Sequence, residues 1–312
     1  GASVHYHMLS PMSKGLFQKG ISQSGTALNM WFLNKNPVPQ AKKFSKRLNC
    51  PWDDRHELTK CLKAADPYKI IGLHKDLLKP PRDQIDLFAP TIESVIRQDT
   101  FLTSHPMDII SNETFTKVPW ILGVNSHEGL IHSAEIINDK FFMSWAFQDW
   151  VEFSSRVLHF ERNAKTSRKI QQFYFPDSLT LNSSRTFDDL TDIFSDRVFF
   201  SSNHQTAMLH SKHSPLYTYI FSHRGEIDLV PFLRALRGER YHVAIDIPLY
   251  YIKDWIDRHI FGINPRKYGV CHGEEMIYQF SVPIVPFQSP KSDDFVMSQS
   301  FIRSWVDFAY DE

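Results

Sequence analysis

Residues 117–129 read KVPWILGVNSHEG, and this stretch decides the fold prediction. The run from Val118 to Val124 is almost continuously apolar and is bounded by turn-forming residues, which is typical of a parallel strand buried on both faces. Similar β-prone runs occur at three other places: KGISQSG (19–25), DLFAPTIESV (86–95) and PLYTYIFSH (215–223). Helical patterns cover residues 39–63, 139–175 (as two amphipathic helices) and 296–312. Strands that alternate with helices predict an α/β fold with a mostly parallel sheet.

Two loops carry side chains suited to hydrolysis. Glu128 follows the predicted strand directly, and His272 lies in YGVCHGEE, residues 268–275. Functional side chains of α/β folds sit on loops that leave the carboxyl ends of strands. An acid followed later in the chain by a histidine is the order found in hydrolases whose nucleophilic serine comes first. His127, beside Glu128, competes for the histidine role, and a Glu-Gly turn is also typical of a plain surface loop.

Composition excludes several classes of function. The chain has 312 residues, of which 42% are hydrophobic, so it can bury a large core. Its 35 basic and 35 acidic residues cancel, and no global field favours nucleic acid. No stretch approaches the roughly 20 apolar residues of a transmembrane helix. No H-E-x-x-H motif or Cys/His ligand cluster is present, so we expect no metal and no cofactor.

Three cysteines occur, Cys50, Cys61 and Cys271, so at least one thiol is unpaired within the chain. Cys50 and Cys61 bracket a short polar segment, and spacing alone leaves open a bridge or two free thiols. Two N-glycosylation sequons, at Asn112 and Asn182, favour a secretory route. We therefore expect a secreted glycoprotein, although no signal peptide is visible in the N-terminal residues GASVHYHMLSPMSKG.

The motifs together resemble the type-B carboxylesterase/cholinesterase family. The first residues, GASVHYHMLSPMSKGLF, are similar to the helix after the family's nucleophile elbow, G-E-S-A-G-G-A-S. KGISQSGTAL resembles the next strand with its Q-S-G signature, VPWILGVNSHEG the strand that carries the acid, and YGVCHGEEMIYQF the loop that carries the histidine. FSDRVFFSSNHQTAMLHSKHSPLYTYIF resembles the stretch between them. The resemblance covers nearly the whole chain and implies an α/β-hydrolase fold, with helices on both faces of the sheet.

This resemblance assigns roles to individual positions. It implies that Glu128 is the acid and His272 the general base and acid of a Ser-Glu-His triad, with a disulfide between Cys50 and Cys61. Ser24, in the Q-S-G signature, would supply a hydroxyl near the triad. Three further residues would line the substrate pocket, namely Trp31, Leu130 and Ile131.

The sequence also departs from the family pattern. No G-x-S-x-G occurs, and Gly1 aligns just after the elbow, so we expect residues 1–312 to be the C-terminal part of a single α/β-hydrolase domain. The nucleophile, the oxyanion donors and the N-terminal strands would be missing, and this fragment would be inactive. The stretch from Glu128 to His272 is longer than expected, which indicates an insertion at residues 236–267: a surface insertion, a pocket lid or a partner-binding element.

The implied function is that of a secreted serine carboxylesterase acting on a small, apolar ester. One alternative is a catalytically inactive, cholinesterase-like adhesion or binding protein, but retention of both Glu128 and His272 counts against it. A second alternative is an acyl-hydrolase specialised for one hormone or transmitter ester. The aromatic-rich residues 139–175 suit an apolar substrate without singling one out.

Overall fold

The computed structural model describes residues 1–77, 88–136, 139–176, 184–226, 229–230, 243–263, 268–281 and 289–310. The chain forms two compact units. One unit contains Gly1, residues 18–26 and residues 118–312, and it holds the sheet; the other contains residues 2–17 and 27–117 and is helical in its regular elements. The prediction of a single domain over residues 1–312 stays a prediction.

Within the described residues the sheet has three parallel strands, in the order β1 (Gly20–Gln23), β2 (Trp120–Asn125) and β3 (Leu216–Phe221). Each strand coincides with a predicted β-prone run. All six residues of β2 are buried, as its continuous apolar sequence predicts for a central parallel strand. Because the strands are parallel, the loops after β1, β2 and β3 leave the sheet at the same edge.

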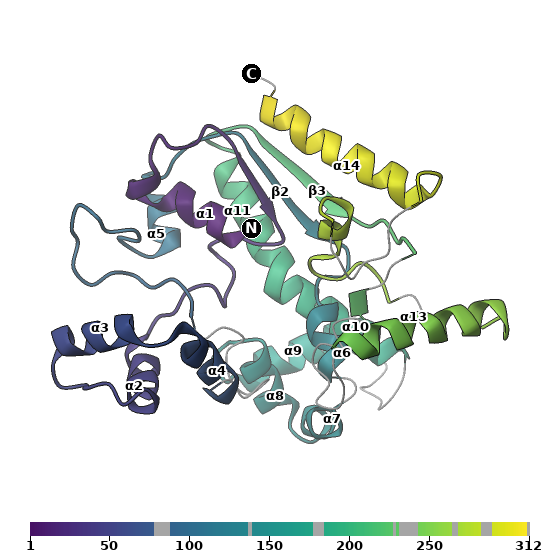
Figure 1. The fold of residues 1–312 in the computed structure, drawn as a ribbon, viewed down its shortest axis with the longest axis horizontal. Helices are drawn as coiled ribbons and strands as arrows, with labels where there is room; N and C mark the ends of the chain where they lie inside the picture. The colour runs from purple at the N-terminus through teal and green to yellow at the C-terminus, as the bar shows by residue number, and fades with distance from the viewer. Residues whose placement is uncertain are drawn as a thin grey trace. The chain divides into compact units, whose positions relative to one another are not determined.

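Helices cover both faces of this sheet, as predicted. Successive residues of β2 point to opposite faces. Trp120 packs edge-on against His210 of α11 (Ser201–His210), which crosses β2 and β3. On the other face, Tyr219 of β3 packs against Trp305 of α14 (Asp293–Tyr310). Figure 1 shows β2 and β3 side by side, with α11 and α14 alongside them.

Other helices of this unit, with bounds that the structure describes, follow β2 and β3 in the chain. They are α6 (Leu130–Ile136), α7 (Lys140–Gln148), α8 (Trp150–Val157), α9 (Ala164–Tyr174), α10 (Ser184–Phe194), the π-helical segment η2 (Ser195–Phe200), α13 (Val243–His259) and the 3₁₀ segment η3 (Glu274–Tyr278). The prediction of two helices over residues 139–175 is wrong, because there are three. Asp149 separates α7 from α8. It follows the last residue of α7, and the Asp149 carboxylate accepts a hydrogen bond from Glu152 N at 3.0 Å, which caps the start of α8.

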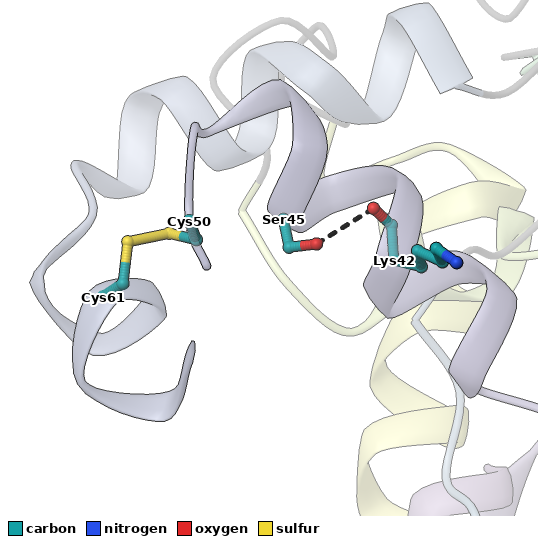
Figure 2. Close-up of a disulfide and its surroundings, with 4 residues drawn as sticks. All are labelled: Lys42, Ser45, Cys50 and Cys61. Carbon is teal, nitrogen blue, oxygen red and sulfur yellow. Dashed lines mark hydrogen bonds between the residues drawn. A yellow bond between two sulfur atoms is a disulfide. The ribbon is translucent and has the colours of Figure 1, made fainter. Parts of the chain in front are cut away.

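The other unit contains α1 (Ala2–Leu9), the 3₁₀ segment η1 (Pro11–Ser13), α2 (Val38–Arg47), α3 (Arg55–Ala64), α4 (Pro67–Leu77) and α5 (Pro106–Ser111). The predicted Cys50–Cys61 disulfide is present, with a Cα–Cα distance of 5.7 Å, and it links the end of α2 to α3 (Figure 2). The α2 end also carries a hydrogen bond from Ser45 Oγ to Lys42 O at 3.0 Å. Cys271 is a buried free thiol.

One predicted strand is absent. Residues 88–95, the described part of DLFAPTIESV, form loop structure. This segment bonds to residues of other loops in place of a ladder: Pro90 O accepts from Asn34 N at 2.8 Å, and the Glu93 carboxylate accepts from Phe101 N at 2.6 Å. A proline and a glutamate that bonds nearby backbone therefore override the β propensity of the apolar residues.

The predicted insertion at residues 236–267 is described over residues 243–263, and most of this part is the helix α13. Several of its large apolar side chains are exposed, among them Ile252 and Trp255. None of the described helices combines the length and the apolar character that are needed to cross a membrane.

Candidate active site

Glu128 lies in the loop after β2 and is completely buried. Its Oε1 accepts a hydrogen bond from Asn125 N, the last residue of the strand, at 2.7 Å. A buried carboxylate requires such partners because burial without them costs several kcal/mol. The end of β2 therefore holds the carboxylate in one orientation and leaves its second oxygen for another donor.

That donor is His272. Its Nδ1 lies 2.7 Å from Glu128 Oε2, which fixes the tautomer because a carboxylate only accepts. The loop that presents the imidazole contains Gly269 at φ 126° and Gly273 at φ 80°, backbone conformations that favour glycine. A side chain on Gly269 would also collide with the ring of His127.

The imidazole of His272 has one edge available for chemistry. Its side chain is 30% exposed, and Nε2 has no hydrogen-bond partner among the residues that the structure describes. The ring packs against Phe199 at 4.7 Å between centroids. A buried acid, an oriented imidazole and an accessible second nitrogen are the parts that general-base catalysis needs.

The π-helical segment η2 supports both sides of this pair. Phe199, which contacts His272, and Ser195, whose Oγ accepts from Gly129 N at 2.8 Å, both belong to it. Gly129 has no room for a side chain, because a Cβ would lie 2.1 Å from Thr191 O. π-Helical turns often occur at functional sites. The sequence pattern gave no indication of this one.

His127, the competing histidine, has other partners. Its Nδ1 lies 2.7 Å from Ser126 Oγ, and its Nε2 lies 3.2 Å from the Arg224 guanidinium. Burial, and then the Arg224 charge, lower the pKa of His127, while Asp188 raises it. Because Arg224 can only donate, Nε2 of His127 is an acceptor and the ring is neutral. Its nitrogens are therefore occupied by Ser126 and Arg224, whereas His272 engages Glu128.

A second buried carboxylate belongs to the same site and was missed by sequence reasoning. Glu275 is 1% exposed, and its Oε2 accepts a hydrogen bond from Asn125 Nδ2. Its Oε1 accepts from Gln23 Nε2, of β1, at 3.3 Å. Burial raises the pKa of Glu275, the hydrogen bond from Asn125 lowers it, and the Glu128 charge raises it again. The only available signal was the Glu-Glu pair after His-Gly, which alone is indistinguishable from a solvated helix start.

The model of the carboxylesterase family matches residues 1–312, the whole chain. The chain belongs to the carboxylesterase family. This membership confirms the predicted α/β-hydrolase fold. The parallel sheet with helices on both faces agrees with that fold.

Individual relatives within the carboxylesterase family are distant but matched along nearly all of this chain. It is 29% identical to the venom carboxylesterase-6 of Apis mellifera over 318 residues, which cover 99% of this chain and 51% of that protein. It is 28% identical to a carboxylic ester hydrolase of Bombus ignitus (99% and 50% covered) and 23% identical to the juvenile hormone esterase of Tribolium castaneum (98% and 51% covered). The chain therefore spans about half the length of these relatives.

The other predicted site residues of this carboxylesterase-family chain lie in several environments. Ser24 follows β1 at φ 55°; its N donates to Gly123 O at 2.9 Å, and its buried Oγ has no partner within the described residues. Leu130 is completely buried in a cluster that includes Phe187 and Cys271, and Ile131 packs against this cluster. Trp31 is buried in the other unit, beside Phe32. Their pocket roles stay predictions.

The two sequons differ in what can be said of them. Asn112 is exposed at the C-terminal end of α5. Asn182 lies outside the described residues. Over the described ranges, no group of three or more His, Cys, Asp or Glu side chains is arranged to hold a metal ion.

Proposed function

We propose that the protein is a carboxylic ester hydrolase that uses a Ser-Glu-His triad, with Glu128 as the acid and His272 as the base. The observation that carries this proposal is the 2.7 Å contact between Glu128 Oε2 and His272 Nδ1 at the carboxyl edge of the parallel sheet. The names of the relatives, carboxylesterase and carboxylic ester hydrolase, support the same reaction class.

In the proposed mechanism, His272 Nε2 takes the proton of a serine hydroxyl as the serine oxygen attacks the ester carbonyl. Glu128 stabilises the resulting imidazolium through Nδ1–H. The imidazolium then gives its proton to the leaving alcohol, which leaves an acyl-enzyme. Water attacks this acyl group with His272 again acting as base, and the carboxylic acid and the free serine are released.

The position of Gly1 supports a serine nucleophile next to this pair. Its carbonyl accepts from Ser22 Oγ of β1 at 3.2 Å, and a Cβ on Gly1 would lie 2.5 Å from Gln23 O. Gly1 therefore packs against β1, and Gln23 of this strand also donates to Glu275 of the same site. In the family's G-E-S-A-G-G-A-S motif, the serine comes a few residues before the glycine that Gly1 resembles.

The experiment compares ester hydrolysis by the protein expressed from its complete coding sequence with hydrolysis by residues 1–312. A short-chain aryl ester serves as substrate. We expect turnover by the former, a loss of about 10⁶-fold in kcat in its His272→Gln variant, and none by residues 1–312, which contain no G-x-S-x-G. Turnover by residues 1–312 at a comparable rate would contradict the need for an outside nucleophile.

Covalent labelling separates the esterase from the inactive binding protein. A fluorophosphonate reacts with a serine only when the nucleophile is activated. We expect one labelled serine in the protein from the complete coding sequence and none in its His272→Gln variant. Absence of both labelling and hydrolysis would favour the binding-protein alternative.

We also propose that the substrate is a small, apolar ester and that the protein is secreted. The disulfide between Cys50 and Cys61 and the exposed sequon at Asn112 support an oxidising secretory route. Removal of N-linked glycans from protein secreted by cultured cells should lower its apparent mass, and an Asn112→Gln variant should lose part of that change.

A further inference from the structure

We propose that the outer face of α2 binds a sulfated polysaccharide. Residues 38–64, which cover α2 and α3, contain seven lysines and arginines against three acidic residues, whereas the whole chain has 35 of each. A local excess of cations attracts polyanions even when the net charge of the protein is zero. The inference goes beyond the proposed function, because α2 belongs to the unit that does not contain the Glu128–His272 pair.

The α2 helix has one buried side and one cationic side. Phe44 and Ser45 are 5% and 1% exposed, and the Phe44 ring packs against Phe88 at 4.9 Å between centroids. At about 100° per residue, the opposite side of the helix holds Pro39, in the first turn, and four exposed cations. These four residues form the α2 cationic face: Lys42, Lys43, Lys46 and Arg47.

The charge of the α2 cationic face is not neutralised by neighbouring side chains. None of its four cations forms an ion pair with a residue that the structure describes, and α2 itself contains no acidic residue. Lys42 Nζ lies 5.8 Å from the centroid of the Trp52 ring, a contact that leaves the positive charge in place.

Helix stability does not account for the whole α2 cationic face. Lys46 and Arg47 lie in the last turn of α2, where a cation interacts favourably with the helix dipole. Lys42 and Lys43 lie in the middle of the helix, and the dipole effect falls off within the first and last turns. Two of the four cations therefore have no part in stabilising the end of the helix.

The neighbouring helix adds to the same positive potential. The Cys50–Cys61 disulfide joins the end of α2 to α3 (Figure 2), which reduces the ordering cost of presenting both helices to one polymer. The acids of this segment lie at the start of α3, where the Asp54 carboxylate accepts from His56 N at 2.7 Å and caps the helix. Three cations of α3 are exposed, namely Arg55, Lys60 and Lys63.

The composition of the α2 cationic face indicates the class of polyanion. Apart from Pro39 it presents only cations, so it offers neither an aromatic ring for stacking on nucleic-acid bases nor a long apolar side chain for insertion into lipid. Several cations on an open helix face suit a polymer with a negative charge on each repeat. The choice of a sulfated polysaccharide, an extracellular polymer, rests on the proposed secretory route, which the disulfide and the exposed sequon at Asn112 support.

The test measures binding of a heparin oligosaccharide to the protein expressed from its complete coding sequence. In the variant, all four residues of the α2 cationic face are changed to glutamine, which removes the charge and keeps a similar helix propensity. We expect Kd at physiological salt to rise about 10- to 100-fold. The slope of log Kd against log salt concentration should fall by about 3–4, roughly one for each contacting cation that is removed.

A charge-matched control distinguishes a binding face from general electrostatic attraction. It changes three lysines and one arginine that are likewise exposed but belong to the other unit, and its Kd should stay within about twofold of wild type. Both variants should keep the wild-type thermal unfolding midpoint. Binding is measured without an ester, so a protein that hydrolyses none would still give the same result at this face. The control substitutions are Lys140→Gln, Lys165→Gln, Arg168→Gln and Lys169→Gln.

Four outcomes would overturn the proposal. Heparin that does not bind wild type, or that binds the α2 variant as tightly as wild type, would show that this face is not the site. Equal weakening in the α2 variant and the control would reduce the effect to net charge. Desulfated heparin, which keeps its carboxylates, should bind at least tenfold more weakly, and equal affinity would remove the role of sulfate. Tighter binding of a DNA duplex or of phosphatidylserine vesicles at the same salt concentration would assign the face to nucleic acid or to lipid.

Discussion

His272 Nδ1 and Glu128 Oε2 lie 2.7 Å apart although 144 positions separate them in the chain. The acid is completely buried at the end of β2, whereas the imidazole is 30% exposed on a glycine-containing loop. An arrangement of this kind orients a base from behind while leaving its working nitrogen accessible.

Glu128→Gln should lower kcat about 10⁴-fold, the loss typical when the acid of a serine hydrolase triad becomes an amide. The amide can donate to Nδ1 and so stabilises the tautomer whose proton is on Nε2. Steady-state kinetics of the protein from its complete coding sequence would measure this effect. Glu161→Gln, an exposed change in the same unit, is the control and should have wild-type kcat. A Glu128→Gln variant with kcat near wild type would remove Glu128 from the triad.

Gly123→Ala should lower the free energy of unfolding by about 1–3 kcal/mol, because the new methyl group overlaps the partly buried Tyr219 ring. Replacing that ring as well, in Gly123→Ala/Tyr219→Leu, should relieve part of the loss, with a coupling energy of about 0.5–3 kcal/mol in a double-mutant cycle. Denaturant unfolding measures both. Gly72→Ala, an exposed position in α4 with no atom within 4 Å of the added Cβ, is the matched control and should stabilise by about 0.5–1 kcal/mol. Additive single and double changes would show that the ring does not depend on Gly123.

Removing the Cys50–Cys61 disulfide by the double substitution to serine should lower the free energy of unfolding by about 3 kcal/mol, the chain-entropy value for a loop of this size. Thiol titration in denaturant supplies the check: residues 1–312 should show one reactive thiol, Cys271, before reduction, and all three cysteines after it. A reducing agent should destabilise wild type and leave the double variant unaffected. Three reactive thiols in unreduced residues 1–312 would contradict the bridge.

Stability should fall as the pH drops through about 6.5, the ordinary pKa of histidine. His210 is buried, and its Nε2 lies 3.0 Å from Val118 O. Burial lowers the pKa of His210, the hydrogen bond to Val118 raises it by less, and His213 lowers it by a still smaller amount. Because the unfolded chain binds the proton at higher pH than the folded one, protonation favours unfolding. Burial also lowers the pKa of His127 and His159, so His210→Gln should remove only part of the slope between pH 7 and pH 5. An unchanged slope in that variant would show that His210 does not contribute.

Sequence reasoning predicted the features that depend on composition and order along the chain. The continuous apolar run before Glu128 predicted a buried parallel strand, and the glycines beside His272 indicated a loop of special shape. Long-range contacts that the family resemblance did not imply were not predictable from the sequence. Nothing near Glu275 in the sequence indicates that Gln23 and Asn125 bond to it, because the three residues meet only when β1 and β2 pair. The strand prediction at residues 86–95 was wrong for the same reason, because Asn34, whose N donates to Pro90 O, is remote in sequence.

The register of the sheet has a consequence for biosynthesis. Trp120 of β2 pairs with Gly20 on one side and with Leu216 on the other, so each pairing closes a loop of about 100 residues. At ordinary translation rates, the second neighbour of β2 emerges roughly 5–20 s after β2 itself. During this interval β2, the most apolar of the described strands, has one open edge, which exposes the nascent chain to pairing with other chains until β3 arrives.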